Sequence, residues 1–172
     1  TEQALKKQKL FAILQMTYVG APMIYYGDEV GMWGANDPDC RKPMVWDDIQ
    51  YQPEIYNPNG SKRPAPEEVN INQGLLEHYK ELINIRNSHP SLRRGSYKTI
   101  KVDDEHEIFG FERKFEGEEV LVIINNSDVK RTTTVLRDGK YNDLLNGGEL
   151  KFSASYNLLE IPAKWGVILL KR

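Results

Sequence analysis

Two neighbouring acids, Asp28 and Glu29, follow a short apolar run, Ala21 to Tyr26. Paired carboxyl groups can act as general acid and nucleophile in glycoside cleavage, but they must converge from different segments, at about 5 Å or 6.5–9.5 Å. Adjacent residues at one strand end point in opposite directions. We therefore expect Glu29 to be structural, binding backbone or neighbouring strand ends, and Asp28 not to be catalytic.

The following stretch, residues 27–72, is rich in Pro, Asn and Asp and has no sustained period, which predicts a long loop. Loops longer than about 15 residues are usually functional or disordered. This loop carries planar aromatic and charged side chains suited to gripping sugar rings and hydroxyls: Trp33, Asp37, Asp39, Arg41 and Trp46. Solvated connectors have the same composition, and Asp37 and Arg41 could equally form an ion pair that stiffens the loop.

Other kinds of chemistry find no support in the sequence. His78, His89 and His106 lack ligand-like spacing, and there is no Gly-rich phosphate loop, nucleophile-elbow Ser or EF-hand pattern. The single Cys40 excludes an internal disulfide and a multi-cysteine metal site. The sequence therefore predicts no cofactor and no metal site, and it leaves both cytoplasm and periplasm open as the compartment.

Composition and charge narrow the class of protein. The 172 residues are 40% hydrophobic and 28% charged, as in a globular protein large enough to bury a core. The net charge of -2 comes from 23 basic and 25 acidic side chains mixed along the chain, so nucleic acid is not expected as a partner. No apolar run approaches the 18 or so residues that span a bilayer, so a membrane partner is not expected either.

Periodicity predicts helix, strand and helix in the first half. Apolar residues at helical spacing, with Gly20 as a stop, predict a helix over residues 3–18. The run 21–26 is apolar on successive residues, which suits a strand buried on both faces. A second amphipathic helix is expected from Leu75 to before Pro90, capped by Asn72.

The second half changes character after Leu92. Strands are expected at Ile108–Phe115, Val120–Ile124, Arg131–Leu136 and Gly166–Leu170, separated by the turn signals Glu116-Gly117, Asp138-Gly139 and Gly147-Gly148. Short strands at this spacing predict an antiparallel β-sandwich. The expected fold is thus α/β plus all-β, with an α/β piece over residues 1–92 and a β-sandwich over residues 93–172.

Several motifs carry a family resemblance. The stretch GAPMIYYGDEVGM, residues 20–32, resembles the eighth-strand motif of the α-amylase family of glycoside hydrolases. The stretch NDPDCRKPMVWD, residues 36–47, looks like the loop after that strand in the neopullulanase, cyclomaltodextrinase and maltogenic amylase branch. Residues 79–86 and 89–95 are similar to the eighth barrel helix and the crossing into the C-terminal domain.

The resemblance implies the terminal helix-strand-helix piece of a (β/α)8 barrel, since a whole barrel takes about 250 residues and only about 92 precede the sandwich. Family members hydrolyse α-1,4 and sometimes α-1,6 glucosidic bonds with retention, and their three catalytic acids would lie upstream of Thr1. No catalytic residue is therefore expected here. By the same resemblance, Asp37 and Arg41 match a loop Asp and Arg that contact sugar on the donor side.

The resemblance also implies the partners, an α-glucan and the missing upstream part of the barrel. A glucosyltransferase parent would look the same, and the sandwich alone could bind starch on Trp165 or Tyr156, or serve purely as a structural domain that helps subunits associate into a homo-oligomer. We favour the structural role. Since the expected strand lacks neighbours, we also expect residues 92–172 to fold and residues 1–74 to be remodelled, partly disordered or paired with a second copy.

Overall fold

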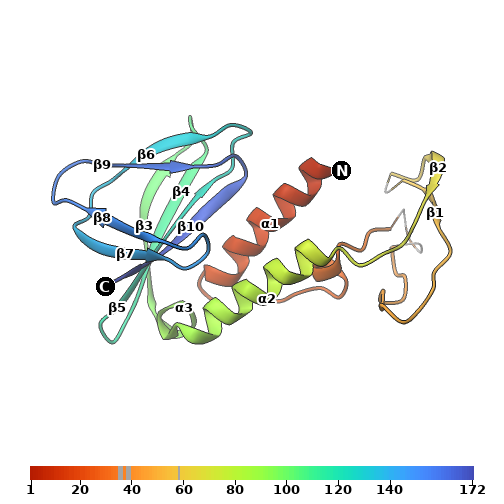
Figure 1. Cartoon of the computed structure of the whole chain (residues 1–172), viewed down its shortest axis with the longest axis horizontal. Helices are drawn as coiled ribbons and strands as arrows, with labels where there is room; N and C mark the ends of the chain where they lie inside the picture. The colour runs from red at the N-terminus through yellow and green to blue at the C-terminus, as the bar shows by residue number, and fades with distance from the viewer. Residues whose placement is uncertain (35–36, 38–39, 58) are drawn as a thin grey trace. The chain divides into compact units, whose positions relative to one another are not determined.

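A computed structural model describes residues 1–34, 37, 40–57 and 59–172. The chain divides into two compact units (Figure 1). One unit contains residues 1–22 and 80–172, and the other contains residues 23–79. The two are treated separately below.

The larger unit contains two antiparallel sheets, as the sequence predicts. The first has six strands in the order β3-β4-β5-β10-β7-β8, and the second pairs β6 with β9 and lies across it (Figure 1). The strands are β3 Ser96–Asp103, β4 Ile108–Phe115, β5 Glu118–Asn125, β6 Arg131–Val135, β7 Gly139–Asp143, β8 Glu149–Phe152, β9 Asn157–Ile161 and β10 Trp165–Lys171. The four strands expected from the sequence are all present, and β3, β7, β8 and β9 are additional.

The core of the sandwich lies between its two sheets. Its buried members are Ile108, Leu121, Ile123, Val135, Tyr141, Phe152, Leu159, Ile161, Val167 and Leu169. Strand β5 contributes Leu121 and Ile123, whereas the alternate residues Val122 and Ile124 point to the opposite face of the sheet and are buried as well. A strand that is buried on both faces needs a second cover, and helices supply it.

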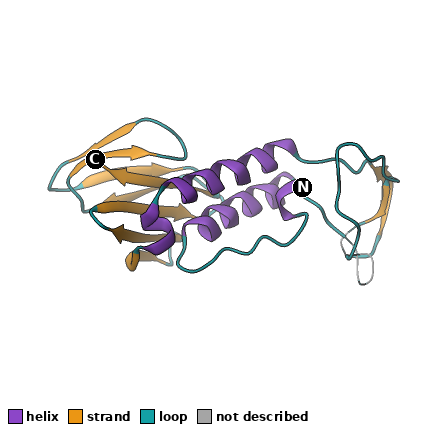
Figure 2. Cartoon of the chain, turned by 90° about the horizontal axis from the view of Figure 1, so that it is seen from below, coloured by secondary structure: helices purple, strands orange, loops and turns teal. Residues whose placement is uncertain are grey.

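Helix α1, Glu2–Thr17, packs on that outer face. The approach is close at Gly166, where an added Cβ would lie 3.5 Å from the Ile13 side chain and 3.0 Å from that of Ile124. Beside α1 runs the C-terminal half of helix α2, Gln73–Ser88, as Figures 1 and 2 both show. Both helices confirm the sequence prediction within two residues. No helix in the described ranges has the length and apolar content needed to cross a bilayer.

A short helix that the sequence analysis does not predict, α3 Pro90–Arg94, joins α2 to the sandwich. Its first turn is held by strand β5, because the Ser91 N–H donates to the Glu118 carboxylate at 2.8 Å. The second carboxylate oxygen of Glu118 lies 3.0 Å from His89 Nδ1. Gly95 then closes the junction, since an added Cβ there would lie 2.2 Å from the Ser91 carbonyl oxygen. The connection between helices and sandwich is thus packed tightly.

The smaller unit consists mainly of the expected long loop. It contains a 3-10 turn η1, Asp28–Val30, and an antiparallel hairpin of β1, Glu54–Tyr56, and β2, Lys62–Glu67. It ends in the first turns of α2, where the Asn72 side chain accepts the Leu75 N–H at 2.9 Å. This contact confirms Asn72 as the helix cap.

The strand expected over Ala21–Tyr26 is not formed, and residues 21–25 have no regular secondary structure. A strand needs a neighbour for its backbone donors and acceptors, and none of the described strands pairs with this run. Helix α1 nevertheless forms and packs on the sandwich. That residues 1–74 are remodelled, partly disordered or paired with a second copy stays a prediction.

Candidate functional site

The candidate site lies in residues 23–79 and begins with a tight turn. Gly27 and Gly31 bracket η1 with φ values of 90° and 77°. These left-handed conformations favour glycine. A Cβ at Gly27 would also lie 2.6 Å from Met32 Sδ, so a larger residue would have to displace the Met32 side chain. The sequence thus bends sharply where the apolar run ends.

The two acids of this turn, Asp28 and Glu29, have different surroundings. The Glu29 carboxylate accepts the Gly27 N–H at 3.0 Å, which is the structural role expected for Glu29. Burial, followed by the neighbouring Glu29 charge, raises the pKa of Asp28 above its ordinary value. Burial also raises the pKa of Tyr79 to about 12, with smaller contributions from the charges of Asp28 and Glu29. The charges of Asp28 and Glu29 therefore act on each other and on the Tyr79 hydroxyl of α2.

Asp37 and Arg41 form an ion pair with each other. Arg41 Nε lies 2.9 Å from Asp37 Oδ1, and the side chains are 72% and 63% exposed respectively. This is the ion pair that the sequence analysis left open as one alternative. The exposure also leaves both groups accessible to a sugar hydroxyl, so the geometry is compatible with either role. Asp39, the third charged candidate, lies outside the described residues.

Trp33 is held between cations of the same unit. Lys42 Nζ lies 4.8 Å from the centre of its ring and Arg63 Cζ lies 4.3 Å from it, distances at which a cation is attracted to the ring. Lys42 is also paired with Glu54, and Arg63 with Glu67. The sequence analysis did not single out Lys42 or Arg63, and no local spacing signals a contact between residues 30 apart in the chain.

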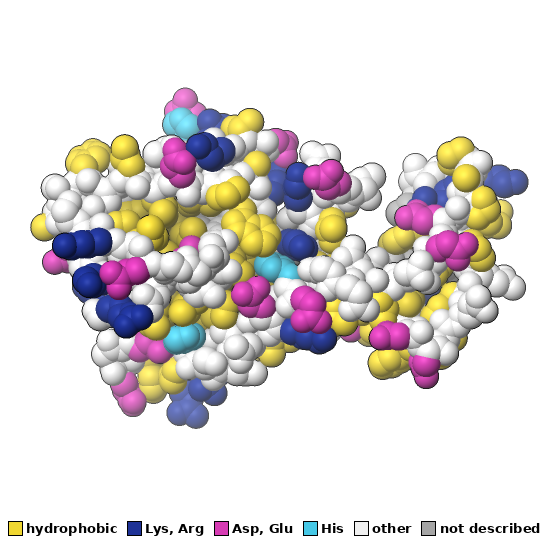
Figure 3. All heavy atoms as spheres, in the orientation of Figure 1, with side chains coloured by type: hydrophobic (Ala, Val, Ile, Leu, Met, Phe, Trp, Pro, Cys, Tyr) yellow, Lys and Arg dark blue, Asp and Glu magenta, His cyan; other side chains and the backbone are white. Residues whose placement is uncertain are grey.

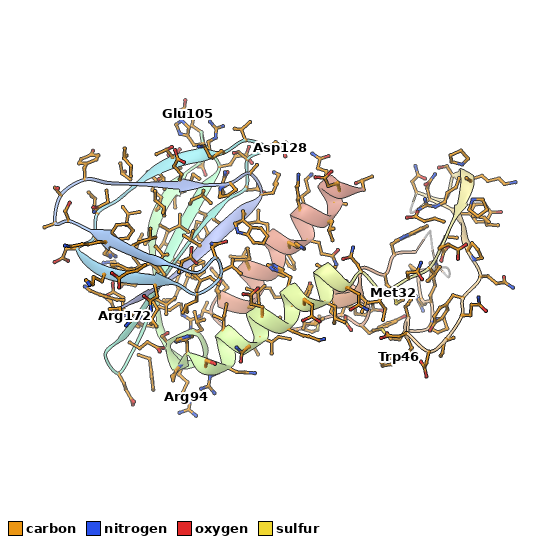
Figure 4. The ribbon with its side chains drawn as sticks, viewed as in Figure 1. Met32, Trp46, Arg94, Glu105, Asp128 and Arg172 are labelled. Atoms are coloured by element: carbon orange, nitrogen blue, oxygen red, sulfur yellow. The ribbon has the colours of Figure 1, made fainter. Side chains whose placement is uncertain are left out.

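Trp46 is the more exposed of the two tryptophan candidates in this loop. Its side chain is 56% exposed, and Figure 4 labels it on the loop. Its backbone N–H donates to the Tyr51 hydroxyl at 2.9 Å, and that hydroxyl donates to the Met44 carbonyl at 2.9 Å. The backbone around Trp46 is therefore fixed while its ring remains accessible, as a stacking contact with a sugar ring would require.

Possible metal ligands do not gather in the part of the chain that the structure describes. Within the described ranges, no three His, Cys, Asp or Glu residues lie close enough together to hold a metal ion. Basic and acidic side chains alternate over the face shown in Figure 3. The candidate site thus consists of charged and aromatic side chains that can contact a neutral polar ligand.

Comparison with family models assigns both halves of the chain. Residues 1–95 match the model described as α-amylase, catalytic domain, and residues 99–161 match the α-amylase C-terminal all-β domain. The chain belongs to the α-amylase family. This family of glycoside hydrolases is the one that the motifs at residues 20–32 and 36–47 resemble, and the expected fold class is confirmed with it.

Curated relatives place this α-amylase-family chain near the expected branch. It is 36% identical over 167 residues to neopullulanase 2 of Thermoactinomyces vulgaris, covering 95% of this chain and 25% of that protein. It is 34% identical over 163 residues to a cyclomaltodextrinase of Thermoanaerobacter pseudethanolicus, covering 95% of this chain and 24% of the relative. The chain thus spans about a quarter of the length of these relatives.

Solved structures share the fold. The α-amylase of Geobacillus thermoleovorans, complexed with acarbose, superposes with a TM-score of 0.78 at 19% identity, covering 98% of this chain and 33% of that one. A maltogenic amylase from S. marinus gives a TM-score of 0.67 at 26% identity, covering 96% of this chain and 19% of that one. The arrangement of helices and sandwich described above is therefore that of α-amylase-family enzymes.

Proposed function

We propose that this chain is the C-terminal part of a retaining α-glucan hydrolase that acts on α-1,4 bonds, and in some substrates α-1,6 bonds, of starch, pullulan or cyclodextrin-like glucans. The observation that carries the proposal is the match of both family models in the family's order, together with relatives named neopullulanase and cyclomaltodextrinase. Residues 1–92 then belong to the end of the catalytic barrel and residues 93–172 to the β-domain.

The chain's own contribution to substrate binding is a donor-side contact through Asp37 and Arg41. Their exposure and charge support this role, because hydrogen bonds from charged groups are the stronger ones that a sugar hydroxyl can make. Trp46 supplies an accessible ring in the same unit. The ion pair would hold both groups in place until a sugar arrives.

The remainder of the protein is the proposed partner of residues 23–79. This unit exposes large apolar side chains that a free surface rarely carries together, namely Met23, Tyr25, Tyr26, Trp46, Ile49, Ile55 and Tyr56. An upstream segment of the barrel would cover part of this surface. A second copy of the chain is the other candidate for covering this surface. Sedimentation would distinguish the two candidates, because a second copy would make the chain a dimer when the upstream barrel segment is absent.

A test of the binding role uses the full-length protein. Asp37→Ala and Arg41→Ala should each lower kcat/KM. The loss of transition-state stabilisation should be about 1–3 kcal/mol, the scale of losing a charged hydrogen bond. Asp48→Ala, which removes another exposed acid of the same loop, is the matched control and should leave kinetics unchanged. Wild-type kinetics for both site variants on α-1,4 and α-1,6 substrates would reject the binding role.

The isolated chain is expected to be inactive. Asp28 and Glu29 are adjacent in one turn and Glu29 is bonded within it, so neither can face the other across a glycosidic bond. Reducing-sugar release from pullulan, cyclodextrin and soluble starch measures this. Release by the purified chain that a point change within it abolishes would contradict the proposal.

A further inference from the structure

The C-terminal end of α1 is only partly capped by its own residues: the Tyr18 N–H donates to the Leu14 carbonyl oxygen at 2.8 Å, and the Thr17 hydroxyl donates to that of Ile13 at 2.6 Å. Its last turn contains no basic residue, and Tyr18 at the cap position is extended, with φ -68° and ψ 166°. The last carbonyl groups of a helix have no partner within the helix and carry its partial negative charge. The carbonyl groups of Met16 and Thr17 find their partners elsewhere in the chain.

Arg86 of α2 supplies the first of them. Its Nη1 donates to the carbonyl oxygens of Met16 at 2.7 Å and Tyr18 at 3.3 Å. Its Nη2 donates to the carbonyl oxygen of Gly20 at 2.6 Å. The side chain is only 7% exposed, so one guanidinium satisfies three carbonyls away from solvent.

Arg113 of β4 supplies a second set of hydrogen bonds at this junction. Its Nη1 donates to the carbonyl oxygen of Thr17 at 2.8 Å, a residue 96 positions earlier in the chain. Its Nη2 donates to the Gly95 carbonyl at 3.1 Å, and its Nε to the Ser96 carbonyl at 3.2 Å. With 1% exposure, Arg113 ties the helix end to the start of the sandwich.

The partners of both guanidiniums are neutral carbonyl groups. Burial lowers the pKa of Arg113, and the nearby charge of Arg86 lowers it further. A buried cation is costly unless its donors are all satisfied. The partial negative charge at the C-terminal end of α1 therefore stabilises the buried cations Arg86 of α2 and Arg113 of β4. In turn, the two arginines satisfy carbonyl groups at the end of α1.

Aromatic packing accompanies the polar contact. The Tyr18 ring lies 5.0 Å from that of Tyr97 on β3 and 5.6 Å from that of Phe111 on β4, both edge to face. Such pairs add about 0.5–1.5 kcal/mol beyond burial. The end of α1 is thus bound to the sandwich both by hydrogen bonds from a buried arginine and by aromatic contacts.

We propose that Arg86 and Arg113, together named the arginine clamp, couple the folding of α1 to that of the sandwich, so that the two open as one cooperative unit. The inference rests on the structural role proposed for the sandwich and specifies how that role is performed. It makes residues 1–22 part of the folding unit of the β-domain, although their sequence belongs to the catalytic-domain model.

Native-state hydrogen exchange on the whole chain tests the coupling. In the wild type, the slowest amides of α1 should exchange within about threefold of the slowest amides of β5. In Arg86→Met and Arg113→Met, α1 should exchange at least about tenfold faster than β5, because losing one charged hydrogen bond alone corresponds to that factor. Arg94→Ala removes an exposed arginine of α3 and should leave the ratio unchanged (Figure 4).

A Lys variant keeps the test decisive if a Met variant does not fold. Arg113→Lys retains the charge but cannot reach three carbonyls in the fork geometry of arginine, so α1 should still exchange faster than β5. A wild-type α1 that exchanges more than a hundredfold faster than β5 would overturn the proposal. So would an unchanged ratio in the folded Met or Lys variants. Neither outcome bears on sugar binding, which the kinetics of Asp37 and Arg41 variants test separately.

Discussion

Replacing Glu118 by Gln should weaken the junction between α3 and the sandwich in a pH-dependent way. The carboxylate of Glu118 accepts the Ser91 N–H at 2.8 Å and lies 3.0 Å from His89 Nδ1. Its side chain is largely buried. Gln has nearly the same shape and can keep a neutral hydrogen bond to Ser91, so the change removes charge rather than volume.

The expected magnitude follows from the hydrogen bonds. A bond to a charged group contributes about 1.5–3 kcal/mol and a neutral one about 0.5–1.5 kcal/mol, so Glu118→Gln should cost about 1–2 kcal/mol at pH 7. Burial raises the pKa of Glu118, but the bonds from Ser91 and His89 outweigh it and hold the pKa below its ordinary value of 4.5. A lowered pKa gives stability that is present above about 4.5 and is lost as pH falls through the folded value.

Urea unfolding followed by circular dichroism, at pH 7, 5.5 and 4, measures the effect. The difference between wild type and Glu118→Gln should be smaller at pH 4 than at pH 7 and 5.5, because the carboxylate of Glu118 becomes protonated as pH falls. Glu116→Gln, an exposed acid of the same hairpin turn, is the matched control and should change stability little. Equal stability of Glu118→Gln and wild type at pH 7, or a difference that does not shrink at pH 4, would refute the reasoning.

Two substitutions and one hydrogen-exchange measurement have defined outcomes. Gly95→Ala should lower the free energy of unfolding by about 1–3 kcal/mol or more, as seen in urea unfolding, because its Cβ would lie 2.2 Å from the Ser91 carbonyl oxygen. Leu121→Ala should cost about 2–5 kcal/mol in the same assay, since the side chain is fully buried in the sandwich core. In hydrogen exchange, residues 120–124 should be protected and residues 23–26 should exchange quickly, and equal protection in a dilute monomer would contradict the unpaired state of the latter run.

The candidate site could be predicted only in part. The pair Asp37 and Arg41 is four residues apart, so the sequence suggests both a contact and a sugar-binding motif, and the structure shows the contact. Glu29 likewise binds backbone nearby, as expected. The contacts of Trp33 with Lys42 and Arg63 depend on how the loop and the β1-β2 hairpin come together. Local sequence contains no information on that approach.

The fold shows the same division. The sequence by itself determined α1, α2 and its Asn72 cap, and strands β4, β5, β6 and β10, because period, capping and turn residues act over a few positions. Only the tertiary structure decided that residues 21–25 remain unpaired and that α1 ends on two arginines 70 and 96 positions away from the carbonyls they bind. A strand needs a neighbour and a buried charge needs a partner, and both are supplied by segments distant in the chain.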